Sequence, residues 1–211
     1  MKILFITFSM AIAVSSCGQN SKTAILPAKQ TNIVNTVPPE LVTDDSTFWT
    51  ISTVSTIGYV NTTPGANYNT YQSGGGMLVK FKFKKNNRFE FRLYVQANSY
   101  GTSSEAWTHV EGMVEFTKDD KGQNIFITKA EKGTYRTNRY GVLNSRPIPE
   151  SELKGRHSCT FLWEKTNLKD DPNNIYLLTV DLEQHPNADI NTPGTIDPSW
   201  ISRFHIQRKV D

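Results

Sequence analysis

The chain of 211 residues lacks the residue spacings that mark a catalytic or metal site. It has only two cysteines, and its four histidines are far apart, with no His-x-His, His-Glu-x-x-His or Cys-x-x-Cys pattern. It also lacks the Gly-x-Ser-x-Gly turn of a nucleophilic hydrolase and a phosphate-binding glycine loop that opens a helix. We therefore expect no metal site, no cofactor and no catalytic residue, and we interpret the protein as non-enzymatic.

An excess of charge of one sign is also absent. Lys and Arg number 23 against 20 Asp and Glu, which gives a formal net charge of +3. Such a balance does not indicate a surface for nucleic acid, and we expect no nucleic-acid partner. Beyond a short N-terminal run, no apolar segment reaches the roughly 20 residues that a membrane-spanning helix needs. With 37% hydrophobic residues, the chain has enough apolar material for one core.

The N-terminus carries the most specific pattern in the chain. Lys2 precedes an apolar stretch over residues 3–14, and the run Val14-Ser15-Ser16-Cys17 ends it. A charged start, a short apolar core and small residues at the end are typical of a secretory signal peptide. A small-residue run that ends in cysteine resembles the lipobox of bacterial lipoproteins. The resemblance implies a signal peptide over residues 1–16, diacylglycerol on the Cys17 thiol and acylation of its amino group. The alternative is a secretory signal without lipid.

Lipidation at Cys17 would tie the mature protein to a membrane of the cell envelope. In familiar lipoprotein sorting an Asp after the lipidated cysteine retains the protein at the inner membrane. Gly18 therefore favours the outer membrane, with the protein facing the periplasm or the cell surface. Residues 17–46 are polar and proline-containing, which predicts an extended tether, and the domain is then expected over residues 47–211. With Cys17 modified, the chain offers Cys159 no second cysteine for an intramolecular disulfide, and we expect Cys159 to be a small buried residue.

The clearest local pattern predicts a β-hairpin with one apolar face. Phe83 ends a set of apolar residues that alternate with lysines, and Phe89 begins a second alternating set. A two-residue loop at 86–87 would place the two apolar sets on opposite faces, whereas a three-residue loop at 85–87 pairs Phe83 with Phe89. The longer loop needs a left-handed residue at its end, and Asn87 tolerates that conformation.

Other segments show strand-like composition and no long helical period. They are expected at 48–60, 107–117, 124–130, 133–140, 157–165, 175–183 and 200–209. Long loops are expected at 61–76 and 141–155, with one helical turn near 149–154. We predict an all-β fold in which eight or nine strands form an antiparallel meander that closes into a barrel, with a β-sandwich as the alternative.

Trp49 opens the first expected strand, and Arg203 and Arg208 lie on the last one. This arrangement resembles the lipocalin and calycin group, in which an early Trp packs near an Arg of the final strand, although the Gly-x-Trp motif of that group is absent here. The resemblance implies a lipocalin-like barrel. Eight strands enclose an interior that side chains fill or that holds one small ligand. Seven phenylalanines are expected to point inward: Phe81, Phe83, Phe89, Phe91, Phe116, Phe161 and Phe204.

Candidate binding residues lie in a basic stretch with interleaved aromatic rings and beside a polar loop. Tyr135, Arg136, Arg139 and Tyr140 belong to the basic stretch, which also contains Arg146, and Trp107 lies beside the loop. Arg and Tyr near loops suit an anionic or sugar ligand, or a protein partner. The lysine-rich face of the hairpin is a second basic surface. We expect it to be a solvated face that protects a sheet edge, and attraction to anionic lipid headgroups is its alternative role.

Two functions fit these features. The first is a lipid-anchored envelope binding protein that holds a small apolar or amphipathic ligand in the barrel or at its mouth. The second is a lipid-anchored interaction module, such as an inhibitor of a secreted enzyme or an envelope-assembly partner, which uses its loops. Seven inward phenylalanines would fill an eight-stranded barrel and so favour the second. We expect the protein to be a monomer.

Overall fold

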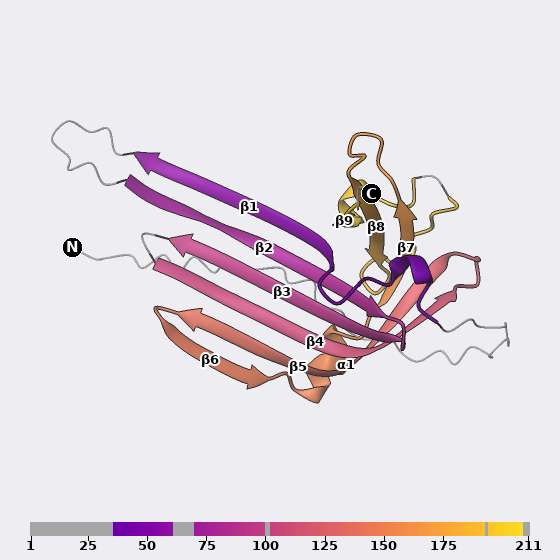
Figure 1. The fold of residues 1–211 in the computed structure, drawn as a ribbon, viewed down its shortest axis with the longest axis horizontal. Helices are drawn as coiled ribbons and strands as arrows, with labels where there is room; N and C mark the ends of the chain where they lie inside the picture. Colours follow the sequence, from indigo (N-terminus) through magenta and orange to yellow (C-terminus); the bar gives the residue numbers. More distant parts are fainter. Residues whose placement is uncertain (1–35, 61–69, 100–101, 193, 209–211) are drawn as a thin grey trace.

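The computed structural model describes residues 36–60, 70–99, 102–192 and 194–208, and Figure 1 shows their arrangement. The expected signal peptide, Cys17 and most of the expected tether lie outside the described residues. The described strands pair in antiparallel fashion. Along them, more buried and more exposed residues alternate, as in a sheet with one face toward the core. Their bounds are β1 Trp49–Val60, β2 Thr70–Lys84, β3 Arg88–Ser99, β4 Thr102–Lys118, β5 Asn124–Arg139, β6 Val142–Pro147, β7 Thr160–Thr166, β8 Asn174–Asp181 and β9 Ser202–Gln207.

Eight of these strands close into a barrel, as the sequence predicts. The ring runs β1-β2-β3-β4-β5-β7-β8-β9 and returns to β1, while β6 pairs with β5 outside the ring. One short helix, α1 (Glu150–Arg156), and two 3-10 turns, η1 (Pro39–Leu41) and η2 (Pro198–Trp200), complete the described elements. No helix among the described residues is long and apolar enough to span a membrane.

The barrel is closed at one end only. The start of β5, Ile125–Ile127, pairs with β7, whereas its last part, Thr134–Arg139, pairs with β6. Strand β1 contacts β9 through a single ladder pair, Thr50 with His205. Beyond this closed end, strands β1 to β6 continue as an open twisted sheet, which we call the extension (Figure 1).

The predicted hairpin is confirmed in register and in turn geometry. Phe83 pairs with Phe89 across β2 and β3, and the turn consists of residues 85–87. Asn87 has a φ of 56°, which places it in the left-handed region that a three-residue turn requires.

The loops expected at 61–76 and 141–155 are partly wrong, because β2 and β6 occupy much of them. Strand β2 begins at Thr70 and runs through the Gly74-Gly75-Gly76 triplet. A Cβ on Gly75 would lie 2.3 Å from the carbonyl oxygen of Gln96, so only glycine allows β3 to approach this closely. A loop was expected here because a run of glycines, judged by composition alone, is typical of a loop.

The two strands expected at 124–130 and 133–140 form one strand, β5. Its ladder with β4 shifts between Glu111 and Gly112, so that Lys132 pairs with Glu111 and Ala130 with Gly112. The intervening Glu131 is left out of the pairing as a β-bulge. Inner-face residues of β5 are even-numbered before the bulge and odd-numbered after it. The extra residue at the bulge therefore keeps both sets on one face of the sheet.

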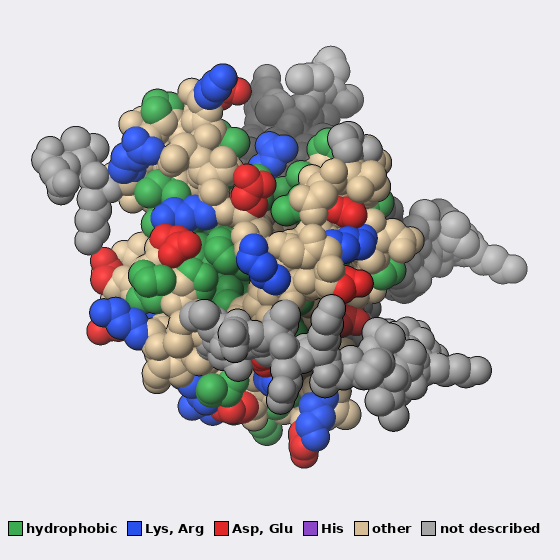
Figure 2. Space-filling model, turned by 90° about the vertical axis from the view of Figure 1, so that its right-hand side faces the viewer, with side chains coloured by type: hydrophobic (Ala, Val, Ile, Leu, Met, Phe, Trp, Pro, Cys, Tyr) green, Lys and Arg blue, Asp and Glu red, His purple; other side chains and the backbone are tan. Residues whose placement is uncertain are grey.

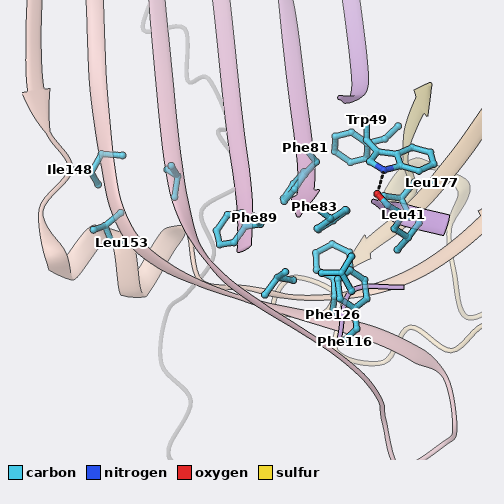
Figure 3. Packing of buried hydrophobic residues seen from close by; sticks show 14 residues of the cluster. Leu41, Trp49, Phe81, Phe83, Phe89, Phe116, Phe126, Ile148, Leu153 and Leu177 are labelled. Carbon is cyan, nitrogen blue, oxygen red and sulfur yellow. Dashed lines mark hydrogen bonds between the residues drawn. The ribbon is translucent and has the colours of Figure 1, made fainter. Parts of the chain in front are cut away.

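The closed end is filled by phenylalanine rings (Figure 3). The Phe81 ring lies 5.2–6.3 Å, between centroids, from six other phenylalanine rings. All seven predicted inward phenylalanines belong to this cluster or pack against it, and Phe126 joins them. Each such ring pair adds about 0.5–1.5 kcal/mol beyond the burial of its apolar area. The cluster therefore occupies the space that a ligand inside this part of the barrel would need.

Residues 37–42, within the segment expected to be a tether, pack against the barrel. Leu41 is fully buried, and its carbonyl oxygen accepts a hydrogen bond of 3.0 Å from the indole Nε1 of Trp49 (Figure 3). The backbone N–H of Val37 donates to the side-chain oxygen of Asn87, and Val42 forms a parallel bridge with Phe83. Residues 37–42 thus plug the closed end of the barrel and do not belong to an extended tether.

The Trp–Arg packing implied by the lipocalin resemblance is not formed. Trp49 is fully buried and packs in the phenylalanine cluster. Arg203 precedes the inward-facing Phe204 on β9, so alternation places Arg203 on the exposed outer face, and Arg208 is also exposed. The likeness to lipocalins is therefore one of barrel architecture.

The buried position expected for Cys159 is confirmed, because its side chain is only 6% exposed. The expectation of no disulfide depends on lipidation of Cys17, which lies outside the described residues, so it stays a prediction.

Replacing Leu41 with alanine tests whether residues 37–42 belong to the domain. We expect Leu41→Ala to lower the free energy of unfolding by about 2–5 kcal/mol, because a fully buried leucine leaves a cavity against the phenylalanine cluster. Chemical denaturation followed by tryptophan fluorescence measures this change. Glu40→Ala, at an exposed neighbouring position, is the control and should change stability by less than about 0.5 kcal/mol. An equally small effect of Leu41→Ala would place this segment outside the domain.

Candidate ligand-binding site

Side chains on the inner face of the extension become smaller and more exposed with distance from the closed end. The ladders align them in rows across β1 to β5. The first row is Trp49, Phe81, Phe91, Val110 and Gly133; the second is Ile51, Val79, Leu93, Thr108 and Tyr135; the third is Thr53, Met77, Val95, Ala106 and Thr137.

Burial changes in step with these rows. Trp49, Phe81 and Val110 of the first row are at most 7% exposed. The second row is half-buried throughout, and Met77 in the third row is 39% exposed. The second row therefore forms the rim of the filled barrel, and we call it the mouth row.

A polar cluster continues the mouth row on the β5 side. The Tyr135 hydroxyl donates to Oε2 of Glu152 at 2.9 Å and lies 3.1 Å from Nε2 of His157. Arg146, the β6 neighbour of Tyr135, places its guanidinium 4.7 Å from the centroid of the tyrosine ring. Since the single hydroxyl proton goes to Glu152, we assign His157 Nε2 as a donor to the Tyr135 oxygen. These four residues make up the polar cluster.

The environment of this cluster shifts two pKa values. Burial, together with the hydrogen bond to Glu152, raises the pKa of Tyr135 to about 12, so its hydroxyl keeps its proton at neutral pH. Burial lowers the pKa of His157, and the nearby Arg156 acts in the same direction against the opposing effect of Glu152. A neutral imidazole agrees with the donor assignment at Nε2.

Helix α1 is held where its residues meet Tyr135. Leu153 of α1 and Ile148 are each 5% exposed and join the main core, as Figure 3 shows beside β5. Ile148 can pack here because residue 133 is glycine and has no Cβ. A Cβ at this position would lie 2.7 Å from the Cδ1 atom of Ile148. The Ser158 hydroxyl donates to the carbonyl oxygen of Leu153 at 3.0 Å and accepts from the backbone N–H of Ala130 at 2.9 Å. These contacts fix the helix that carries Glu152 and the link that carries His157.

The structure separates the five binding residues predicted from the sequence. Tyr135 lies on the inner face, but Arg136 and Trp107 lie on the outer face, where the guanidinium is 5.2 Å from the indole ring. Arg139 is exposed near the far end of β5, and Tyr140 is 81% exposed in the following turn with a φ of 53°. The structure therefore brings only Tyr135 into the mouth site.

The sequence placed Arg146 in the candidate basic stretch, but it did not indicate Glu152 or His157 as members of the polar cluster. The period of two along a strand was the available signal, since it prevents the adjacent Tyr135 and Arg136 from sharing a face. It gave no indication that a strand at 142–147 would bring Arg146 beside Tyr135. Glu152 and His157 come from α1 and the link after it, and only the tertiary fold places them near β5.

The basic face of the predicted hairpin is largely occupied by internal contacts. Lys82 is 4% exposed; its Nζ donates to the Asp45 carbonyl oxygen and lies 4.5 Å from the Phe48 ring centroid. Arg88 forms an ion pair of 2.6 Å with Glu131. Figure 2, which views the molecule from the right-hand side of Figure 1, shows basic and acidic side chains interspersed on the side that faces the viewer. Neither observation favours a strongly cationic membrane-binding surface.

One group of possible metal ligands occurs among the described residues, on the outer face of β3 and β4. Glu90 and Glu111 lie 3.1 Å and 3.5 Å from Nε2 of His109. Arg92 donates to Glu90 at 2.6 Å through Nε, and Lys132 pairs with Glu111 at 2.7 Å, which lowers the pKa of Glu111. These cations already balance the carboxylates, so we interpret the group as an ion-pair network.

The mouth row and the polar cluster together suit an amphipathic ligand. Val79 and Leu93 offer half-buried apolar surface, and Arg146 offers a guanidinium whose side chain is 60% exposed. Adjacent strands are about 4.8 Å apart, so roughly 10–15 Å separates Leu93 from Arg146 across the sheet. A molecule with an anionic group and a long extended apolar chain spans that distance.

The lowered pKa of His157 predicts a pH dependence of stability. The unfolded chain has a histidine pKa of about 6.5. Because the folded value is lower, the contribution of neutral His157 is complete above about pH 6.5 and is lost as the pH falls through the folded pKa. We expect an NMR titration to give a His157 pKa below 6.5, with His157→Gln identifying the resonance. In the same variant, the decline of unfolding free energy from pH 7 to pH 5 should be smaller. A His157 pKa above 6.5 would contradict the expected effect of burial on the imidazole.

No protein-family model, curated protein or solved structure matches this chain.

Proposed function

We propose that this protein is a lipid-anchored binding protein of the bacterial cell envelope. It is non-enzymatic, and it holds an amphipathic ligand at the mouth of its barrel without a cofactor. The observation that carries this proposal is the contact of the half-buried mouth row with a polar cluster that contains an exposed arginine. An apolar strip and a cationic group at one end are the features that bind a molecule with an apolar body and an anionic head.

The filled barrel favours the mouth over the interior as the proposed place of binding. Phe81, Phe126 and Phe161 contact one another across the closed end, with ring centroids 4.9–6.3 Å apart. A ligand there would have to displace rings that are packed at the density of a protein interior. Just beyond the mouth row, by contrast, the inner face is open enough for Met77 and Ala106 of the third row to be exposed.

A protein-interaction module is the second candidate. The filled interior favours it, because a barrel without a cavity serves as a rigid scaffold for surfaces at its rim. In that case the mouth row receives an apolar side chain of the partner, and Arg146 pairs with an acidic residue.

The sequence Val14-Ser15-Ser16-Cys17 supports the proposed anchor and its place at the outer membrane. Cys17 is the only other cysteine of the chain beside Cys159. Its thiol can carry a diacylglycerol or join a disulfide, so the two modifications exclude each other on one molecule.

Binding of cis-parinaric acid, a fluorescent long-chain fatty acid, tests the mouth site. We expect Arg146→Ala to raise the dissociation constant roughly tenfold, because a hydrogen bond to a charged group contributes about 1.5–3 kcal/mol. Arg136→Ala is the matched control, since it removes an arginine from the opposite face of the neighbouring strand. The control should leave the fluorescence titration unchanged.

Three outcomes of this titration separate the proposals. Weakening by Arg146→Ala alone supports the mouth site. Equal weakening by both variants contradicts it, because the response then reflects only overall charge. No binding of the fatty acid by the wild type would favour the protein-interaction module over an amphipathic ligand.

Mass spectrometry of the N-terminal peptide tests the anchor. In protein extracted from membranes, we expect the first residue to be Cys17 with a thioether-linked diacylglycerol and an acylated amino group. Cys17→Ser should abolish both modifications and release the protein from the membrane fraction. A peptide pair joined by a disulfide between Cys17 and Cys159, without lipid, would contradict the anchor and leave the barrel and its mouth site unaffected.

A further inference from the structure

Strand β1 has a long edge with no partner among the described residues. On one side, β1 pairs with β2 along its whole length, from Trp49 opposite Phe81 to Val60 opposite Thr70. On the other side, its ladder with β9 consists of Thr50 and His205 alone. In Figure 1 the part of β1 that belongs to the extension lies at the border of the sheet, beyond the reach of β9. The backbone of residues 51–60 therefore has hydrogen-bonding groups directed away from β2 without a described strand to receive them.

The sequence of this edge has none of the features that usually prevent strand addition. Residues 50–60 read Thr-Ile-Ser-Thr-Val-Ser-Thr-Ile-Gly-Tyr-Val, with no charged residue and no proline. More than half of them are β-branched, which favours the extended conformation. Natural edge strands are commonly protected by lysine, by proline or by being short. With 12 residues, β1 is about twice the length of a typical strand.

The second free edge of the extension, on β6, is protected in the expected way. Strand β6 has 6 residues and includes Arg146 and Pro147. The contrast between the two edges shows that the absence of protection is specific to β1.

We propose that the free edge of β1 binds the same edge of a second copy of this chain, and so forms a symmetric antiparallel dimer. Antiparallel pairing of a strand with itself is the arrangement that a two-fold axis perpendicular to the sheet generates. If one residue lies opposite itself at the axis, each odd-numbered residue pairs with an odd-numbered residue of the other copy, and each even-numbered residue with an even-numbered one. The equivalent faces of the two copies therefore lie on the same side of the joined sheet. An uncharged strand brings no like charges together in this arrangement, whereas a charged edge would place each charge near its own copy.

The size of this contact predicts a weak dimer. About ten residues pair over roughly 33 Å of strand. Pairing along one edge buries less than the roughly 1,200 Å² typical of a stable interface. The fraction of dimer should therefore rise with protein concentration. This differs from the monomer expected from the sequence.

Sedimentation equilibrium of the full chain in density-matched detergent tests this inference. We expect the wild type to pass from monomer to dimer between micromolar and millimolar concentration. Val54→Lys with Thr56→Lys, near the middle of the free edge, should raise the dissociation constant of the dimer by about tenfold or more through repulsion between the two copies. Leu143→Lys on β6 is the matched control, because it adds a lysine to the other free edge, and it should dimerise like the wild type.

Thermal unfolding by circular dichroism shows whether each variant keeps its fold. Hydrogen exchange then provides a readout that does not depend on variants, because amides in residues 51–60 should become protected as the wild-type concentration rises. A wild type that stays monomeric at millimolar concentration overturns the proposal. So does a dimer that persists in the folded β1 variant, or one that Leu143→Lys abolishes. None of these outcomes bears on the mouth site.

Discussion

The packing of rings around Phe81 is the interaction on which the rest of the structure depends. Its six phenylalanine neighbours come from β2, β3, β5, β7 and β9, so one side chain connects strands from all parts of the ring. Aromatic rings fill the interior of an eight-stranded barrel, and strands that converge on them must tilt and close. Away from the cluster the rows contain aliphatic and then small residues, which cannot fill a second closed section. The same cluster therefore explains both the closed end and the open extension.

The change from β6 to β7 as the partner of β5 places the polar cluster. The chain leaves the edge of β5 opposite Thr134, where β6 ends, and returns to it opposite Ile127, where β7 begins. Helix α1 lies between these two points, and Ile148 and Leu153 pack into the core there. Gly133 permits that packing, because any side chain there would meet Ile148. Glu152 and His157 then reach Tyr135 from one side while Arg146 reaches it from β6. A half-buried glycine on β5 thus helps to determine where the polar groups meet.

The sequence predicted the features that depend on local alternation. The register of the β2–β3 hairpin and the left-handed Asn87 followed from the parity of Phe83 and Phe89. Features that depend on contacts between distant segments were missed. Leu41 lies in a polar, proline-containing stretch, and only its contacts with the closed end of the barrel give it a place in the core. The site was predicted in part, because Tyr135 and Arg136 were grouped by sequence proximity although adjacent strand residues face opposite sides.

The extension offers two surfaces that do not compete with each other. The polar cluster lies at β5 and β6, whereas the free edge belongs to β1, and β2, β3 and β4 lie between them. With about 4.8 Å between neighbouring strands, roughly 19 Å separates β1 from β5. A second copy paired at β1 would continue the sheet away from the polar cluster and leave the mouth row accessible. Because the paired strands keep one face in common, the two mouth sites of such a dimer would open toward the same side of the joined sheet. Side-by-side sites with a common orientation suit a protein that faces a single surface, and an anchored envelope protein is in that position.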